Sequence, residues 1–251
     1  MLQNSMHPIS EAERQTRVDL ATAYRLMDYF GVQDLTYNHL SARVPGEPNA
    51  LLIKPSDFMF GEISVSNLRK YDLQGRPLGH REEPLKGGAL VIHAGIMRLR
   101  PAINAVFHTH TPANMALAAQ ARGLLPITQQ AMLFFERISM HSFAGFEFDP
   151  GMEQSLVDDL GHNSVAILRN HGALVVADTV AEAFVIHHFL EIAAKAQVGA
   201  LAGNMELTIP PPEACRAAAD KMAAIEATKN GGKNWAACRR LADRLFPDLH
   251  S

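Results

Sequence analysis

The chain has 251 residues, 47% of them hydrophobic and 20% charged, which are the proportions of a folded globular protein and argue against disorder. Its formal net charge is -3, so no basic excess points to a nucleic-acid partner or to a membrane surface. Two cysteines, Cys215 and Cys238, are too few for a disulfide scaffold or for a structural zinc site, whereas histidine is abundant, with 12 copies.

No targeting or membrane-spanning segment is expected in this chain. Residues 1–10 lack the basic region followed by an apolar run that marks a signal peptide. A run of about 18 apolar residues free of charges and turn signals, as a membrane span needs, does not occur. We therefore expect a cytoplasmic protein with no membrane partner.

Helix and strand signals alternate along the chain. Ser10 and Glu13 form a capping box that begins a helix over 11–30, and Thr179 and Glu182 form a second capping box. Further helices are expected over 84–99, 112–122, 149–160 and 180–202, and strands over 51–53, 103–107, 165–168 and 173–176. Because no linker is long enough to divide the chain, we expect one α/β domain over 1–209, with 210–251 as a C-terminal helical extension of the same domain.

Three histidines stand where a metal ion could be held. His108 and His110 end a predicted strand two residues apart, so their imidazoles point to the same face and can converge on one ion. Taken alone, this spacing is more often a surface pair. His171 sits in a turn between two predicted strands, where Gly172 permits a tight bend and a third ligand can join the first two. Three neutral imidazoles with an open position are typical of catalytic zinc, and a polar turn residue is the alternative for His171.

Six segments together resemble the class II aldolase/adducin family, in particular its adducin-like bacterial branch. They keep the order and approximate spacing of the family over roughly residues 14–205. The segments are 38–43, 54–56, 100–101, 105–113, 123–127 and 168–172. The resemblance implies a three-layer α/β/α sandwich around a largely antiparallel sheet, usually assembled as a homotetramer.

The same resemblance implies a metal cofactor. In enzymes of this family, histidines that match His108, His110 and His171 bind a divalent metal ion. Zinc is the first expectation for this chain, with iron or manganese as alternatives.

Substrate-binding residues are expected in two of the matched segments and at the glycine pair 87–88, which stands where the family has a pair of serines. The resemblance places Asn38, Ser56 and Gly88 in the substrate site, where Gly88 can offer a backbone N–H group. Lys54 carries a charge suited to a carboxylate, and a solvated surface lysine is the alternative. His141 matches a histidine of adducin-like members and is the candidate acid or base, with a packed, hydrogen-bonded histidine as the alternative.

Departures from the family pattern bear on the reaction. Family aldolases and epimerases place an acidic residue four positions before the histidine that matches His93, and here that position is Ala89. Alanine can neither move a proton nor bind metal. In the phosphate-binding elements Tyr37 replaces a small residue and Asp57 replaces a glycine, and the Asp57 carboxylate would repel a phosphate dianion. We therefore expect a non-phosphorylated substrate.

The other histidines are expected to play no direct part in metal binding. His93 is expected to be structural, and neither His187 nor His188 is expected to be a ligand. Four more are expected on the surface, namely His7, His80, His162 and His250.

Together the residues and the resemblance favour a metal-dependent lyase that breaks a carbon–carbon bond in a small, carboxylate-bearing, non-phosphorylated substrate. A metal ion can act as the electron sink for decarboxylation without an initial base, whereas retro-aldol cleavage also needs one, so the loss of the acidic residue is more damaging to aldol chemistry. Two alternatives remain. One is a non-catalytic adducin-like module that binds a protein, and the other is a non-haem iron oxygenase, for which the usual carboxylate ligand is not seen.

Overall fold

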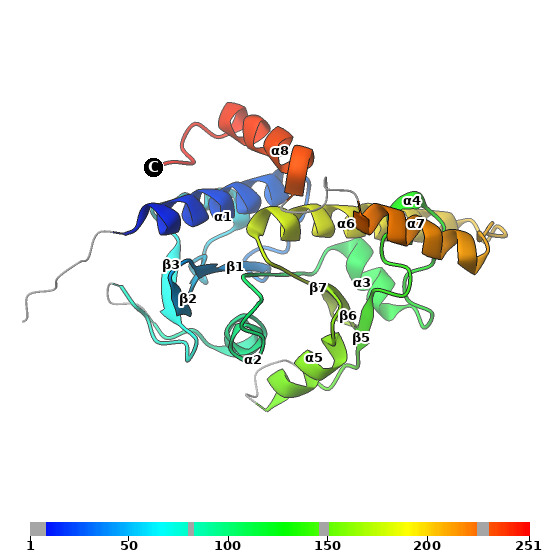
Figure 1. Cartoon of the computed structure of the whole chain (residues 1–251), viewed down its shortest axis with the longest axis horizontal. Coiled ribbons are helices and arrows are strands. Elements are labelled where there is room, and N and C mark those ends of the chain that lie inside the picture. The colour runs from blue at the N-terminus through cyan, green and yellow to red at the C-terminus, as the bar shows by residue number, and fades with distance from the viewer. Residues whose placement is uncertain (1–8, 80–82, 146–150, 225–230) are drawn as a thin grey trace, which may run out of the picture.

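In the computed structural model, which describes residues 9–79, 83–145, 151–224 and 231–251, one seven-stranded sheet forms the centre of the molecule (Figure 1). Its strand order is β3-β2-β1-β4-β7-β6-β5. The strands are β1 (His39–Val44), β2 (Glu47–Ile53), β3 (Arg69–Asp72), β4 (Ala105–Thr109), β5 (Ser139–His141), β6 (Val165–Leu168) and β7 (Gly172–Ala177). All neighbours are antiparallel except β5 and β6, which are parallel, so the predicted largely antiparallel sheet is confirmed.

Helices cover both faces of this sheet, which gives the predicted three layers (Figure 1). On one face lie α1 (Glu11–Tyr29), α3 (Pro112–Ala119), α6 (Val180–Ala202) and α8 (Gly232–Leu245). On the other lie the π-helix η2 (Ala89–Gly95), α2 (Ile96–Leu99) and α5 (Met152–Leu160). The remaining helices are η1 (Phe60–Glu62), α4 (Gln129–Met132) and α7 (Pro212–Ala224).

The alternation of side chains along β4 divides the core in two. Phe107 packs in the cluster under α1 and α6, whereas its neighbour Val106 packs in the cluster under η2 and α5. By the same period of two, His108 shares the face of Val106, and Thr109 shares the face of Phe107. This alternation directs His108 toward one layer of helices and Thr109 toward the other.

Caps predicted from the sequence begin the long helices. The backbone N–H of Glu13 donates to Ser10 Oγ at 3.1 Å, and that of Glu182 donates to Thr179 Oγ1 at the same distance. The helix predicted over 84–99 differs, because its regular part begins at Ala89 as a π-helix. Gly87, with a φ of +58°, interrupts the right-handed backbone just before it.

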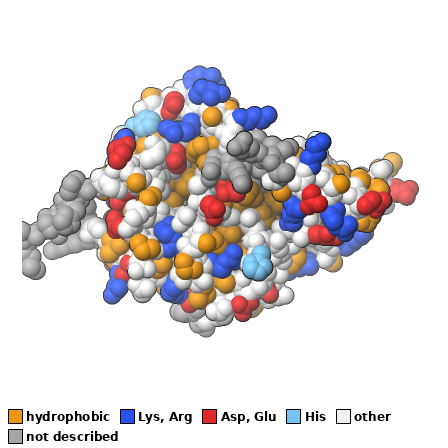
Figure 2. Space-filling view, in the orientation of Figure 1, with side chains coloured by type: hydrophobic (Ala, Val, Ile, Leu, Met, Phe, Trp, Pro, Cys, Tyr) orange, Lys and Arg blue, Asp and Glu red, His pale blue; other side chains and the backbone are white. Residues whose placement is uncertain are grey.

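Part of the helix predicted over 149–160 falls outside the described residues, which resume at residue 151 ahead of α5. Among the helices that the structure describes, none combines the length and the apolar character that crossing a membrane requires. On the face shown in Figure 2, acidic and basic side chains are interspersed, in keeping with a net charge of -3.

Candidate metal centre

The structure brings together the three histidines predicted as ligands. His108 lies at the end of β4, and His110 follows it into the turn that precedes α3. The Nε2 atoms of these two rings are 2.8 Å apart. His171, in the turn between β6 and β7, places its ring centroid 4.8 Å from each of the other two. In the described part of the chain, these three form the one group of potential ligands whose ligand atoms all lie within 4.8 Å of one another.

Hydrogen bonds on the far sides of the rings set which nitrogen carries the proton. His108 Nδ1 donates to the carbonyl oxygen of Ala173 at 3.1 Å, and His110 Nδ1 donates to Asp34 Oδ2 at 2.9 Å. Burial, and then the neighbouring imidazoles, hold the pKa of His108 well below its usual range, so this ring is neutral. Nε2 of His108 is thereby left with a lone pair, and this atom faces Nε2 of His110.

This arrangement fits a divalent cation. Two lone pairs facing each other at 2.8 Å repel unless a proton or a cation lies between them. Tetrahedral zinc with bonds of roughly 2.0–2.1 Å would set its nitrogens about 3.3 Å apart, close to the spacing found here. The hydrogen bond from His110 to Asp34 is also the kind of outer contact that orients a metal-bound histidine. His108, His110 and His171 would therefore hold the ion.

Close approach of two backbone segments brings His171 to the other histidines. A Cβ atom on Gly172 would lie 2.4 Å from the carbonyl oxygen of Thr109 and 2.9 Å from the ring of His110. Asn170, just before His171, takes a φ of +57°, which Asn tolerates better than most residues. The turn sequence therefore fits its task, since only glycine lets β7 begin so close to β4.

Two further histidines, His39 and His93, continue the cluster of rings from His108. His39 pairs with His108 across β1 and β4, and their rings stack with centroids 6.0 Å apart. His93, in η2, meets the ring of His39 edge-on at 5.5 Å and hydrogen-bonds Ser41 Oγ through Nδ1 at 2.6 Å. Burial lowers the pKa of His93 to about 3, so it is neutral and agrees with the structural role predicted for it.

Sequence reasoning missed His39 and Asp34. His39 comes to lie beside His108 because β1 pairs with β4. Asp34 lies in no local motif that would indicate its contact with His110, a residue 76 positions away. The alternation of side chains in a strand beginning at 39 could have indicated His39, had its register with β4 been known.

Two of the residues predicted to bind substrate, Asn38 and Lys54, are buried. Asn38 is buried, and its Oδ1 accepts the backbone N–H of His110 at 2.8 Å. Lys54 is also buried, contrary to the surface alternative, and donates from Nζ to the carbonyls of Thr36 at 2.9 Å and Pro55 at 3.2 Å. Burial lowers the pKa of Lys54 to about 8, and its charge helps to lower the pKa of His39, so the two are neighbours.

The other predicted residues, Ser56, Gly88 and His141, differ in their exposure and in the elements that carry them. Ser56 is exposed, and Gly88 is half-buried immediately before η2. His141, at the end of β5, is buried and bonded through Nδ1 to Asp159 Oδ2 at 2.7 Å. It shares a sheet face with His108 but stands three strands away, or about 14 Å at 4.8 Å per strand.

Two of the predictions for surface histidines are confirmed, and two fall on residues that the structure does not describe. His162 and His250 are exposed as predicted, while His7 and His80 lie outside the described residues. His187 is fully buried within α6, and its ring hydrogen-bonds Thr109 on the face of β4 opposite His108.

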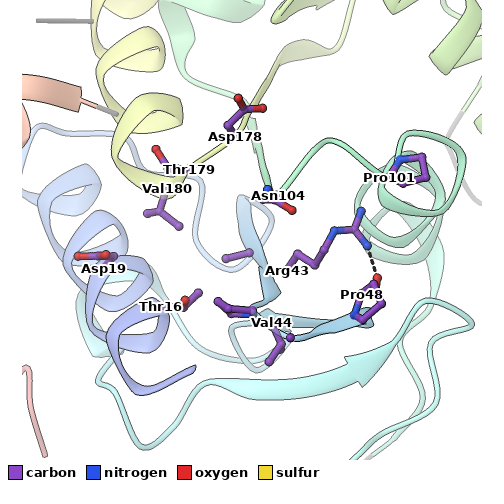
Figure 3. A pocket seen from close by; sticks show the side chains of 13 residues that line it. Thr16, Asp19, Arg43, Val44, Pro48, Pro101, Asn104, Asp178, Thr179 and Val180 are labelled. Carbon is purple, nitrogen blue, oxygen red and sulfur yellow. Dashed lines mark hydrogen bonds between the residues drawn. The ribbon is translucent and has the colours of Figure 1, made fainter. Parts of the chain in front are cut away.

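A cavity of about 560 Å³ opens at the opposite end of the sheet (Figure 3). Its lining joins the end of β1 to Asn104 before β4 and Asp178 after β7, whereas the histidines lie at the other ends of these strands. Arg43 lines it, but its guanidinium donates to the backbone carbonyls of Pro48, Met97 and Ile103. That charge is therefore engaged in holding loops.

Comparison with known proteins finds relatives of one family by sequence and by structure. Residues 18–198 match the family described as Class II Aldolase and Adducin N-terminal domain. A Caulobacter vibrioides protein with the provisional name aldolase class 2 protein is 35% identical over 239 residues, which cover 95% of this chain and 93% of that protein. Alpha-adducin of Rattus norvegicus is 36% identical over 195 residues, which cover 76% of this chain but 26% of adducin. The crystal structure of an aldolase II superfamily protein from Pseudomonas syringae superposes with a TM-score of 0.91 at 37% identity, covering 97% of this chain and 98% of that one.

Proposed function

Because the chain belongs to the class II aldolase and adducin family, we propose that it is a divalent-metal-dependent lyase acting on a small, carboxylate-bearing, non-phosphorylated substrate. The reaction is cleavage of a carbon–carbon bond, by decarboxylation or by retro-aldol cleavage. One observation carries the proposal, namely that the Nε2 atoms of His108 and His110 lie 2.8 Å apart with His171 beside them. We propose zinc as the metal, with iron or manganese as alternatives.

The chemistry divides between the metal and the chain. A divalent cation, when bound, polarises a carbonyl and stabilises the negative charge that develops as the carbon–carbon bond breaks. Lys54 is proposed to bind the substrate carboxylate. An ammonium has three donors, and the carbonyls of Thr36 and Pro55 take two of them, so one remains for substrate. Asn38 would hold the backbone at His110, whose N–H donates to its side-chain oxygen. We propose Ser56 and the backbone N–H of Gly88 as further substrate contacts.

A group other than Ala89 must transfer the proton, because the alanine side chain has no ionisable proton. We propose His141 for this role, because the Asp159 carboxylate fixes its ring orientation and because it lies on the metal side of the sheet. Decarboxylation needs a proton only after carbon dioxide has left, which a more distant acid can deliver through water. This favours decarboxylation over retro-aldol cleavage, whose first step needs a base at the substrate hydroxyl.

The proposed absence of a phosphate group rests on Asp57 and Lys54. The exposed Asp57 carboxylate lies close enough to Lys54 to act on its pKa, and it would repel a phosphate dianion approaching the same ammonium. A monocarboxylate carries half that charge and meets less repulsion.

A screen of the zinc-loaded protein tests the proposal. β-Keto acids, hydroxy-aromatic acids and β-hydroxy acids would be supplied with and without a phosphate group, and carbon dioxide and aldehyde would be measured. We expect turnover of at least one non-phosphorylated class, lost in His108→Ala. Turnover confined to phosphorylated sugars would contradict the substrate assignment, and metal-loaded protein inert toward every class would contradict the lyase.

A second candidate is a non-catalytic module that binds protein, as favoured by Ala89 together with the similarity to alpha-adducin. Its prediction differs, because protein binding should survive His108→Ala. We also propose a cytoplasmic homotetramer. The exposed side chains of Leu35 and Tyr37, beside the loop that holds Lys54, are apolar surface that such an assembly would cover.

A further inference from the structure

Helix α6 presents a row of polar side chains to the metal-binding segment. His187, Glu191 and Lys195 are four residues apart and therefore lie along one face of the helix. His187 and Glu191 are buried, which is unusual for such groups unless they are hydrogen-bonded. Their partners lie in one short segment, Thr109 to Asn114, that includes His110.

The first contact reaches Thr109, which ends β4 and lies between His108 and His110 in the sequence. Thr109 Oγ1 and His187 Nε2 form a hydrogen bond of 2.7 Å, and both side chains are fully buried. Since side chains alternate across a strand, this bond fastens β4 from the face opposite His108 and His110.

The second contact fastens the segment on the other side of His110. Thr111 Oγ1 donates to Glu191 Oε2 at 2.6 Å, and Asn114 Nδ2 donates to the same oxygen at 2.9 Å. Thr111 also caps α3, accepting the N–H of Asn114 at 3.1 Å. Lys195 Nζ lies 3.2 Å from the other carboxylate oxygen of Glu191 and partly balances its charge.

From these contacts we infer that His187 and Glu191 are positioning residues for the metal centre, acting through Thr109 and Thr111. This inference rests on the proposed metal site. His110 is bracketed by two threonines, each held by α6, so the backbone that carries two of the three ligands cannot shift without breaking buried hydrogen bonds. Catalytic groups and metal ligands are held to fractions of an ångström by such supporting contacts.

The surroundings of His187 and Glu191 allow the inference to be tested by isosteric substitution. A cavity of about 110 Å³ adjoins both side chains, so small changes there do not overpack the core. Thr111→Val and Glu191→Gln keep the volume and remove, respectively, the hydroxyl and the charge. Thr111→Ser keeps the hydroxyl and serves as the conservative rescue.

The experiment measures zinc affinity of the apo full-length chain by competition with a chromogenic chelator, together with the absorption spectrum of the cobalt-loaded protein. Loss of an outer contact at metal sites typically weakens affinity about 10- to 100-fold. We expect Thr111→Val and Glu191→Gln to weaken zinc binding by about tenfold or more and to alter the cobalt spectrum. Thr111→Ser should stay within about threefold of wild type.

A matched control separates positioning from stability. Thr179→Ala removes the cap of α6 about 18 Å along the helix from Glu191, and it should lower Tm without changing zinc affinity or the cobalt spectrum. Wild-type affinity and spectrum in folded Thr111→Val and Glu191→Gln would overturn the inference while leaving the proposed function intact. A wild-type chain that binds no metal would overturn both.

The wild-type protein gives a second readout if a variant does not fold. Zinc added to the apo protein should shift the ring NMR signals of His187, which is coupled to the centre through Thr109. The exposed His162 serves as the reference. Unmoved His187 signals on zinc binding would also count against the inference.

Discussion

The contact between His110 and Asp34 offers a direct prediction about metal affinity. Replacing Asp34 with Asn removes the carboxylate charge but keeps an oxygen that can accept the proton of His110 Nδ1, now 2.9 Å from Asp34 Oδ2. The Asp34 side chain is 38% exposed and that of His110 is 14% exposed, so solvent screens part of the interaction. We therefore expect the lower end of the range for outer contacts, about a tenfold loss of zinc affinity or about 1.4 kcal/mol.

Isothermal titration of the apo protein with zinc measures this change. Asp34→Ala should weaken binding more than Asp34→Asn, because it also loses the acceptor that fixes the tautomer of His110. Asp28→Asn is the matched control, since that carboxylate accepts from Gln33 and not from a histidine. Equal zinc affinity for wild type and Asp34→Ala would refute the claim that this bond prepares His110 for a metal.

Four more predictions follow from the same geometry. Affinity for a carboxylate substrate or inhibitor should be constant below pH 8 and should fall up to tenfold per pH unit above it, because the Lys54 ammonium, whose pKa is about 8, then loses its charge. In a binding titration, Lys54→Met should abolish this pH dependence. Gly172→Ala should weaken zinc binding and lower Tm, because its Cβ would lie 2.4 Å from the Thr109 carbonyl oxygen, and normal values for both would contradict the packing argument. Tyr24→Phe should cost about 1–3 kcal/mol in denaturant unfolding, because the buried hydroxyl accepts two backbone N–H groups and donates to a carbonyl. His141→Gln should keep full metal content in elemental analysis but lose turnover, and undiminished turnover would remove His141 from the mechanism.

Local signals in the sequence predicted the elements that carry His108, His110 and His171. The spacing of His108 and His110 predicted that both rings point to the same face, and the capping residues Ser10 and Thr179 marked where α1 and α6 begin. These features depend on neighbours within about four residues, which is why they can be recognised in the sequence alone.

Features set by tertiary contact were missed. The hydrogen bonds of Asp34 with His110 and of Glu191 with Thr111 join residues 76 and 80 positions apart, and neither carboxylate lies in a motif. The burial of Lys54 likewise follows from the loops that close over it, not from its neighbours in sequence. Neither the π-helical form of η2 nor the positive φ of Gly87 just before it is announced by a local sequence signal.

Metal content tests the central claim most directly. The apo protein would be dialysed against zinc, freed of excess, and analysed for metal by mass spectrometry alongside His108→Ala and His171→Ala. The account predicts close to one zinc ion per wild-type chain and a loss of bound zinc in both variants. A wild-type chain without bound metal, or variants that retain wild-type metal content, would contradict it.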